Sequence, residues 1–219
     1  MVQIDILMNM RNQSQVEEIT NSISHGLGLI AAIVGTPFII MHASRQGSTA
    51  FVVGTIVFSL TIIFLYLSST LYHALPISKA KRVFQIVEHC AIFAVIAGTY
   101  TPFMLGILNG AWGWSLLGVI WGLAIAGVML KVFAKLFHPV LSTGLYLLMG
   151  WVIIIAIDPL LERGLAAGFF WLLGGGLSYT AGVIFFVLDS RMRYGHLIWH
   201  LFVIGGSVCH YFAVFWYGA

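Results

Sequence analysis

The sequence predicts an all-α fold, that of a polytopic membrane protein with a bundle of seven transmembrane helices. Three observations lead there: the composition, the number of long apolar stretches and the distribution of the basic residues. Of the 219 residues, 60% are hydrophobic and 8% are charged, whereas a soluble domain carries about 25% charged residues. Too few charged side chains remain to cover a water-facing surface, so we do not expect a soluble globular domain.

Seven stretches are long enough to cross a hydrocarbon core of about 30 Å, which takes about 20 residues of helix. In chain order, they cover residues 25–43, 49–74, 83–108, 112–130, 140–157, 165–188 and 196–217. Short breaks between them imply antiparallel neighbours in one compact bundle. We therefore expect residues 24–219 to form the transmembrane domain.

The basic residues indicate the orientation. Eight of the ten Lys and Arg residues precede the first span or follow the second, fourth and sixth, whereas only Arg45 and Arg163 lie on the opposite side. Cytoplasmic loops carry the excess of Lys and Arg. We expect a cytoplasmic N-terminus and an external C-terminus in the cell (inner or plasma) membrane. The net charge of +3 reports this topology, and no nucleic-acid partner is expected.

Residues 1–23 are polar and are expected to form a cytoplasmic segment without a cleavable signal peptide. Ser14 and Glu17 fit a capping box, so a short helix on the membrane surface is predicted there. Cys90 and Cys209 lie at different depths of their helices, which argues against a disulfide between them.

Polar residues inside the spans mark a candidate functional site, because ionisable groups are costly in a membrane. Ser69 and His73 lie at the inner end of the second span, Glu88 lies one to two turns into the third, and His196 and His200 lie in the first two turns of the seventh. Histidines at i and i+4 share one helix face and can bind one metal ion.

A third nitrogen, from His73, would leave one position for water, which is typical of catalytic zinc. The predicted metal ligands are therefore His73, His196 and His200. The predicted catalytic residues are Glu88, which would hold or deprotonate the water, and Ser69, which would bond to the water, a ligand or Glu88. Imidazole also suits copper, nickel and iron, and the alternative is that these groups only join neighbouring helices.

The remaining histidines are given other roles. His25 is expected either to support the site or to lie at the interface, and His89 is expected to make a structural bond. His42, His138 and His210 are placed away from the site.

Several segments resemble the bacterial hemolysin III family, within the wider progestin and adiponectin receptor family. They are EEITNSISHGLG at 17–28, SSTLYH at 68–73, EHCAIFAVIAGTYTP at 88–102, LYLLMGW at 145–151 and HLIWHLFVIGGSVCH at 196–210. The likeness covers nearly the whole chain.

The resemblance implies a seven-helix bundle with zinc near its cytoplasmic side, held at the positions of His73, His196 and His200. It also places Ser69 and Glu88 at the family's serine and acidic positions, although the family usually has Asp where this chain has Glu88. The wider superfamily includes enzymes that cleave ceramide-like amides.

Three functions follow as hypotheses. The first is a lipid-directed, zinc-dependent hydrolase or a lipid-sensing, membrane-homeostasis protein; as an enzyme, it would cleave a lipid amide, and membrane lipids are its expected partners. The second is a pore-forming cytolysin, which the family name implies. A pore needs polar residues along the whole membrane thickness, whereas here they concentrate in the inner third of the spans. The third is a structural zinc site without catalysis.

Overall fold

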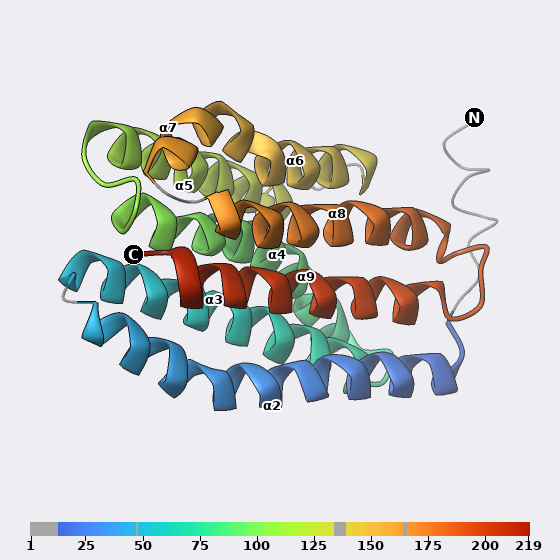
Figure 1. Ribbon diagram of the computed structural model, residues 1–219. Coiled ribbons are helices and arrows are strands. Elements are labelled where there is room, and N and C mark those ends of the chain that lie inside the picture. Colours follow the sequence, from blue (N-terminus) through green and yellow to red (C-terminus); the bar gives the residue numbers. More distant parts are fainter. Residues whose placement is uncertain (1–12, 47, 134–138, 164–165) are drawn as a thin grey trace.

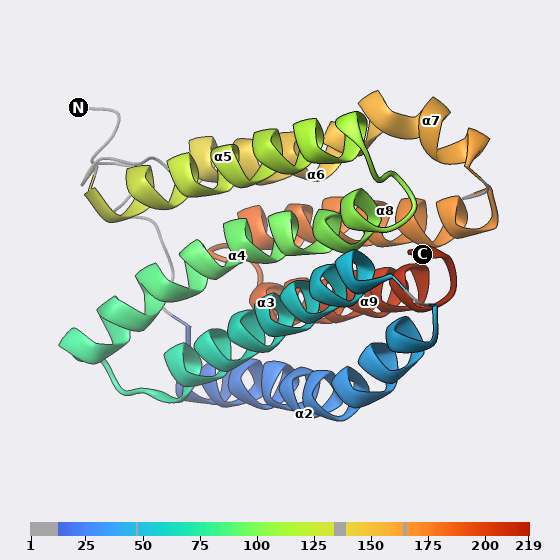
Figure 2. The same cartoon turned by 90° about the vertical axis from the view of Figure 1, so that its left-hand side faces the viewer.

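The computed structural model describes residues 13–46, 48–133, 139–163 and 166–219, and these form helices and their connections without a strand. The elements in chain order are α2 (Gln15–Arg45), α3 (Thr49–Ala74), α4 (Lys79–Leu105), α5 (Ala111–Phe133), α6 (Pro139–Trp151), η1 (Val152–Ala156), α7 (Ile157–Glu162), α8 (Ala166–Leu188) and α9 (Gly195–Tyr217). Figures 1 and 2 show the longer helices lying roughly antiparallel to one another.

The predicted seven spans are confirmed. Within the described ranges, seven helical stretches are long and apolar enough to cross a membrane, with α6, η1 and α7 together making the fifth. Large apolar side chains point outward from these helices; Leu60 is 59% exposed and Phe170 is 73% exposed. Such exposure would be unfavourable in water but suits contact with lipid. The chain is therefore a multi-pass membrane protein.

The helices pack mainly on their neighbours in sequence. α3 lies between α2 and α4, α4 also contacts α5, α8 pairs with α9, and α9 returns to α2 (Figure 2). A Cβ atom at Gly54 of α3 would lie 2.7 Å from the Cα of Pro102 in α4. A residue without a side chain at this position therefore allows α3 and α4 to approach closely. This contact fixes the two helices that carry His73 and Glu88.

The N-terminal capping box is present, with the Ser14 and Glu17 side chains each bonded to the other's backbone. The helix that it starts differs from the predicted short surface helix, because it continues without a break into the first span and ends at Arg45. The buried side chains of Glu17 and Asn21 explain this continuity, since both face the bundle. Residues 1–12 lie outside the described ranges.

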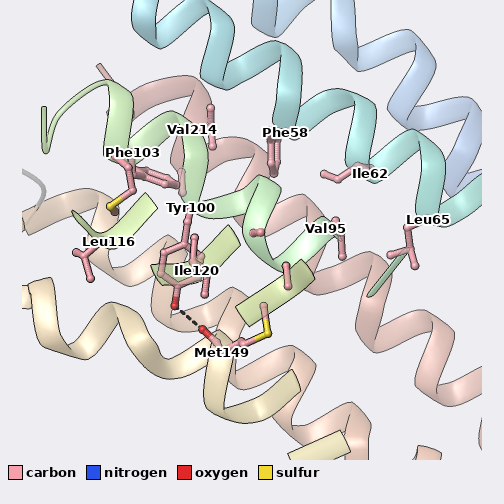
Figure 3. Packing of buried hydrophobic residues seen from close by; sticks show 14 of the residues in the cluster. Phe58, Ile62, Leu65, Val95, Tyr100, Phe103, Leu116, Ile120, Met149 and Val214 are labelled. Carbon is pink, nitrogen blue, oxygen red and sulfur yellow. Dashed lines mark hydrogen bonds between the residues drawn. The ribbon is translucent and has the colours of Figure 1, made fainter. Parts of the chain in front are cut away.

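The fifth span, predicted over residues 140–157, is present at Leu141–Glu162 but is not α-helical throughout. α6 ends at Trp151 and is followed by the 3-10 turn η1 and the short α7. The Tyr100 hydroxyl lies 2.8 Å from the Met149 carbonyl oxygen (Figure 3). It also accepts from the Ile153 N–H at 2.9 Å. A side chain from α4 thus replaces the bond between residues 149 and 153, and such insertions are a known cause of helix breaks.

The core between the helices is filled by apolar side chains. Phe58, Phe103 and Ile120 are each at most 1% exposed and lie in the packed region that Figure 3 shows. Cys90 and Cys209 are free thiols, as predicted.

Candidate metal centre

Four side chains from three helices converge at the end of the bundle where α2, α4 and α9 begin and α3 ends. His73, Glu88, His196 and His200 each offer a ligand atom, and these atoms all lie within 4.8 Å of one another. The ring of His73 lies 5.0 Å from that of His196 and 5.1 Å from that of His200, measured between centroids. The structure therefore brings together the three predicted ligands and the predicted carboxylate in a group that can hold a metal ion.

The Nδ1 atom of each of these histidines bonds to another part of the protein. His73 Nδ1 lies 2.8 Å from Glu18 Oε2, and His196 Nδ1 lies 3.0 Å from Asp189 Oδ2. Because carboxylates only accept hydrogen bonds, both Nδ1 atoms carry the proton.

The Nδ1 atom of His200 also carries the proton, although its partners are neutral. Its Nδ1 lies 3.0 Å from Ser24 Oγ and 3.2 Å from the Asn21 carbonyl oxygen. Ser24 donates its own proton to that carbonyl at 2.8 Å, so its oxygen is left to accept from His200. In their neutral form, all three rings thus have the lone pair on Nε2.

These three Nε2 atoms are buried and have no hydrogen-bond partner among the described residues. A buried nitrogen without a partner is unfavourable, and histidines that bind metals usually donate their other N–H to a carboxylate or carbonyl, as here. Zinc ligands at about 2.0–2.1 Å from the ion lie about 3.4 Å apart, and the candidate ligand atoms here lie within 4.8 Å of one another. The residues therefore fit a zinc ion, with three nitrogens as ligands.

Glu88 completes the group. Its Oε1 lies 3.8 Å from His73 Nε2, beyond hydrogen-bond distance. The side chain is 7% exposed and lines a cavity together with His25 and His196. This position suits a carboxylate that contacts either the ion or a water beside it.

Ser69 is fully buried, and its Oγ lies 2.7 Å from His25 Nδ1. Sequence reasoning had offered water, a ligand or Glu88 as its partner, and the structure adds His25. The His25 ring is 3% exposed and stacks on His200 with 3.5 Å between centroids. Of the two roles predicted for His25, the structure thus favours the one beside the site.

The cavity has a volume of about 440 Å³ and is lined mostly by apolar side chains of α4, α6, α8 and α9. It reaches from Glu88 to Phe103 on α4, and fifteen residues of helix span about 22 Å. The centre therefore lies at one end of a long apolar cavity.

Two other histidines also line this cavity. His210 was placed away from the centre, and its Nε2 lies 3.3 Å from the Leu172 carbonyl oxygen. His89 was expected to make a structural bond, and its backbone carbonyl accepts one from the Tyr146 hydroxyl of α6. His42 lies 3.1 Å from Gln46 near the end of α2, and His138 is outside the described ranges.

Comparison with known proteins agrees with this architecture. A family model described as "Haemolysin-III related" matches residues 13–211. The chain belongs to this family. It is 44% identical to Hemolysin-3 of Bacillus cereus over 210 residues, which cover 96% of this chain and 95% of that protein.

Two further relatives differ in their sequence identity to this chain. The Hemolysin-3 homolog of Bacillus subtilis (strain 168) is 43% identical over 201 residues, covering 92% of this chain and 94% of the relative. The human Monocyte to macrophage differentiation factor is 29% identical over 217 residues, covering 92% of this chain and 84% of the relative. The family likeness therefore extends across the spans that carry the centre.

Sequence reasoning gave no role to Glu18, Asn21 and Asp189, which bond to the candidate ligand histidines, whereas His25 was among its candidates. Glu18, Asn21 and His25 are spaced i, i+3 and i+7, which places them on one helix face. This polar stripe at the start of the first span was a readable signal. Asp189 gave no such signal in the sequence, because it follows the sixth span in a polar connection. The turn before α9 brings it to His196.

Proposed function

We propose that this chain is a zinc-dependent membrane hydrolase that cleaves a lipid amide. The observation that carries the proposal is the set of three buried, unpartnered Nε2 atoms beside Glu88 at one end of a long apolar cavity. Three protein nitrogens with room for water are typical of catalytic zinc sites, whereas structural sites are usually closed by four protein ligands.

The residues fit the roles that amide hydrolysis requires. Zinc held by the three histidines would supply Lewis acidity and activate water at neutral pH. Glu88 would take the proton of the attacking water and deliver it to the nitrogen as the C–N bond breaks, which leaves a carboxylic acid and an amine. The cavity would hold the acyl chain, and its apolar walls would keep other water away from the carbonyl.

The test is acyl-amide cleavage by the zinc-loaded protein in lipid nanodiscs. Mass spectrometry would follow the fatty acid released from a mixture of N-acylated sphingoid lipids. Glu88→Gln preserves size and removes the proton acceptor, so we expect zinc to remain bound while release falls by about 10²–10⁴-fold. His42→Ala, near the other end of α2, is the matched control and should keep the wild-type rate.

A fully zinc-loaded wild-type protein that releases no fatty acid would reject the hydrolase proposal. That result would favour a lipid-sensing or membrane-homeostasis role. The second candidate function is a lytic pore, which the names of the Bacillus relatives favour. Against it stand the apolar side chains that fill the bundle beyond the centre, such as Phe58 and Phe103.

A further inference from the structure

His25 is a buried histidine beside the metal centre that the proposed reaction does not use. It is not a member of the group of converging ligand atoms. Its ring is nearly parallel to that of His200, with an angle of 7° between the planes, and the edge of Tyr66 contacts it at 5.0 Å between centroids. These contacts hold the ring in the wall of the cavity, where Glu88 and His196 also lie.

Hydrogen bonding to Ser69 determines which nitrogen of His25 carries the proton. A serine hydroxyl has one proton to donate, and the only hydrogen bond of Ser69 among the described residues is the 2.7 Å contact with His25 Nδ1. If Nδ1 carried a proton, the buried Ser69 proton would have no acceptor, which is unfavourable. Ser69 therefore donates to Nδ1, and the proton of His25 is on Nε2.

This tautomer is the opposite of that in the three candidate ligands, where Nδ1 is protonated and Nε2 is free. His25 Nε2 is buried without a partner in the described part of the chain. The centre thus combines three nitrogen lone pairs with one N–H group that has no acceptor. A bound molecule with an oxygen acceptor would satisfy that donor.

We propose that His25 is the hydrogen-bond donor that binds the carbonyl oxygen of the substrate amide, and that Ser69 fixes it in the donating tautomer. This inference rests on the proposed function for the identity of the substrate. A donor aimed at this oxygen would also stabilise the negative charge that the oxygen gains when water attacks the carbonyl carbon.

The first test measures binding rather than turnover. The probe is dodecanamide, a neutral amide with an apolar chain, added to the zinc-loaded protein in nanodiscs, and tryptophan fluorescence reports binding because Trp151 and Trp199 line the cavity. His25→Phe keeps an aromatic ring and removes the donor, so we expect full zinc content and an affinity about tenfold lower. His25→Gln places an amide N–H near the position of Nε2 and should restore affinity to within about threefold of wild type.

The second test reads the tautomer directly. Nitrogen-15 NMR of histidine-labelled, zinc-loaded protein should show His25 protonated on Nε2, and Ser69→Ala should release this preference while zinc stays bound. A His25 ring protonated on Nδ1, or equal dodecanamide affinity in wild type and His25→Phe, would overturn the proposal. Loss of zinc in both His25 variants would also overturn it, because His25 would then support the metal ligands.

The two proposals fail separately. A protein that binds dodecanamide through His25 but releases no fatty acid would reject the hydrolase and retain the donor. A His25→Phe variant that hydrolyses lipid amides as fast as the wild type would reject the donor and retain the hydrolase.

Discussion

The tautomer of each candidate ligand histidine is set by the residue that bonds to its Nδ1. A carboxylate fixes the ring of His73 and another that of His196, whereas a serine and a carbonyl fix that of His200. These contacts set both the tautomer and the direction of each Nε2. Changing a ligand, or the residue that bonds to a ligand, tests this arrangement of the centre.

Removing one ligand should abolish tight zinc binding without unfolding the protein. His196→Ala or His200→Ala leaves two histidines, whereas the backbone hydrogen bonds within seven spanning helices do not depend on the metal. We expect elemental analysis to find little zinc and circular dichroism to find wild-type helix content, with His42→Ala as a control that keeps its zinc. Full zinc occupancy in either ligand variant would show that the ligand assignment is wrong.

Removing a residue that holds a ligand should weaken zinc binding without abolishing it. Asp189→Ala frees the His196 ring to rotate and takes the acceptor from its Nδ1, and such changes typically cost about 10–100-fold in metal affinity. Competition with a chelator would measure this loss, with Asp158→Ala in α7 as a control outside the centre. An unchanged zinc Kd in Asp189→Ala would mean that the 3.0 Å contact does not orient the ligand.

At the scale of elements, the break in the fifth span depends on a residue of another helix. The Tyr100 hydroxyl lies within 2.9 Å of the Gly150 carbonyl oxygen as well as contacting Met149 and Ile153. It accepts from the Ile153 N–H and shares its one proton between the two carbonyl oxygens, and a continuous helix would pair these three backbone groups internally. Together with the Tyr146 hydroxyl, which donates to the His89 carbonyl oxygen, the Tyr100 hydroxyl joins α6 and η1 to α4 by hydrogen bonds.

Tyr100→Phe should destabilise the protein, because it removes these bonds and keeps the ring. Leaving a buried backbone group without a partner costs about 1–3 kcal/mol. We expect a lower midpoint of unfolding in SDS and faster hydrogen exchange at the Ile153 amide. Tyr217→Phe, at the end of α9 and outside the fifth span, is the control. An unchanged midpoint together with a protected Ile153 amide would show that α6 and α7 join into one helix without Tyr100.

At the scale of the whole molecule, an odd number of spans places the two termini on opposite sides of the membrane. The loops rich in Lys and Arg share the side of the α2 N-terminus, where the candidate metal centre also lies. The side of the membrane on which this end sits therefore determines which compartment the centre faces.

We predict that the N-terminus is cytoplasmic and the C-terminus external, because eight of the ten basic residues lie on the N-terminal side. Reporter proteins that are active on only one side of the membrane, fused to each terminus, would check this. Activity of the same reporter at both termini would contradict the seven-span topology. Activity only of the cytoplasmic reporter at the C-terminus would show that the whole bundle is inverted.

The packed interior also predicts that the protein does not form large aqueous pores. Beyond the centre, the buried side chains are mainly apolar, and a water-filled channel needs a polar lining through the whole membrane. Liposomes that contain the purified protein should retain an encapsulated dye as well as empty liposomes do. Sustained leakage that stops when a lining residue is changed would overturn this prediction and favour the lytic role.

The fold was predictable from the sequence because lipid imposes a simple condition on each span. A helix that crosses the bilayer needs about 20 apolar residues and satisfies its own backbone, so the seven stretches could be counted without knowing their contacts. The break after Trp151 was not predictable, because it depends on a hydroxyl fifty residues away in α4. Similarly, the helix that starts at Ser14 was readable from its cap, but its continuation into the first span was not.

The candidate site, like the fold, was predictable from the sequence only in part. The sequence alone determined which residues are out of place in a membrane, because an ionisable side chain there is costly wherever its partners lie; this singled out His73, Glu88, His196 and His200. Only the tertiary structure decided what each nitrogen faces. Glu18, Asp189 and Ser69 reach their histidines across helix boundaries, and a hydrogen bond depends on distances of a few tenths of an ångström, which residue spacing along a single helix does not determine.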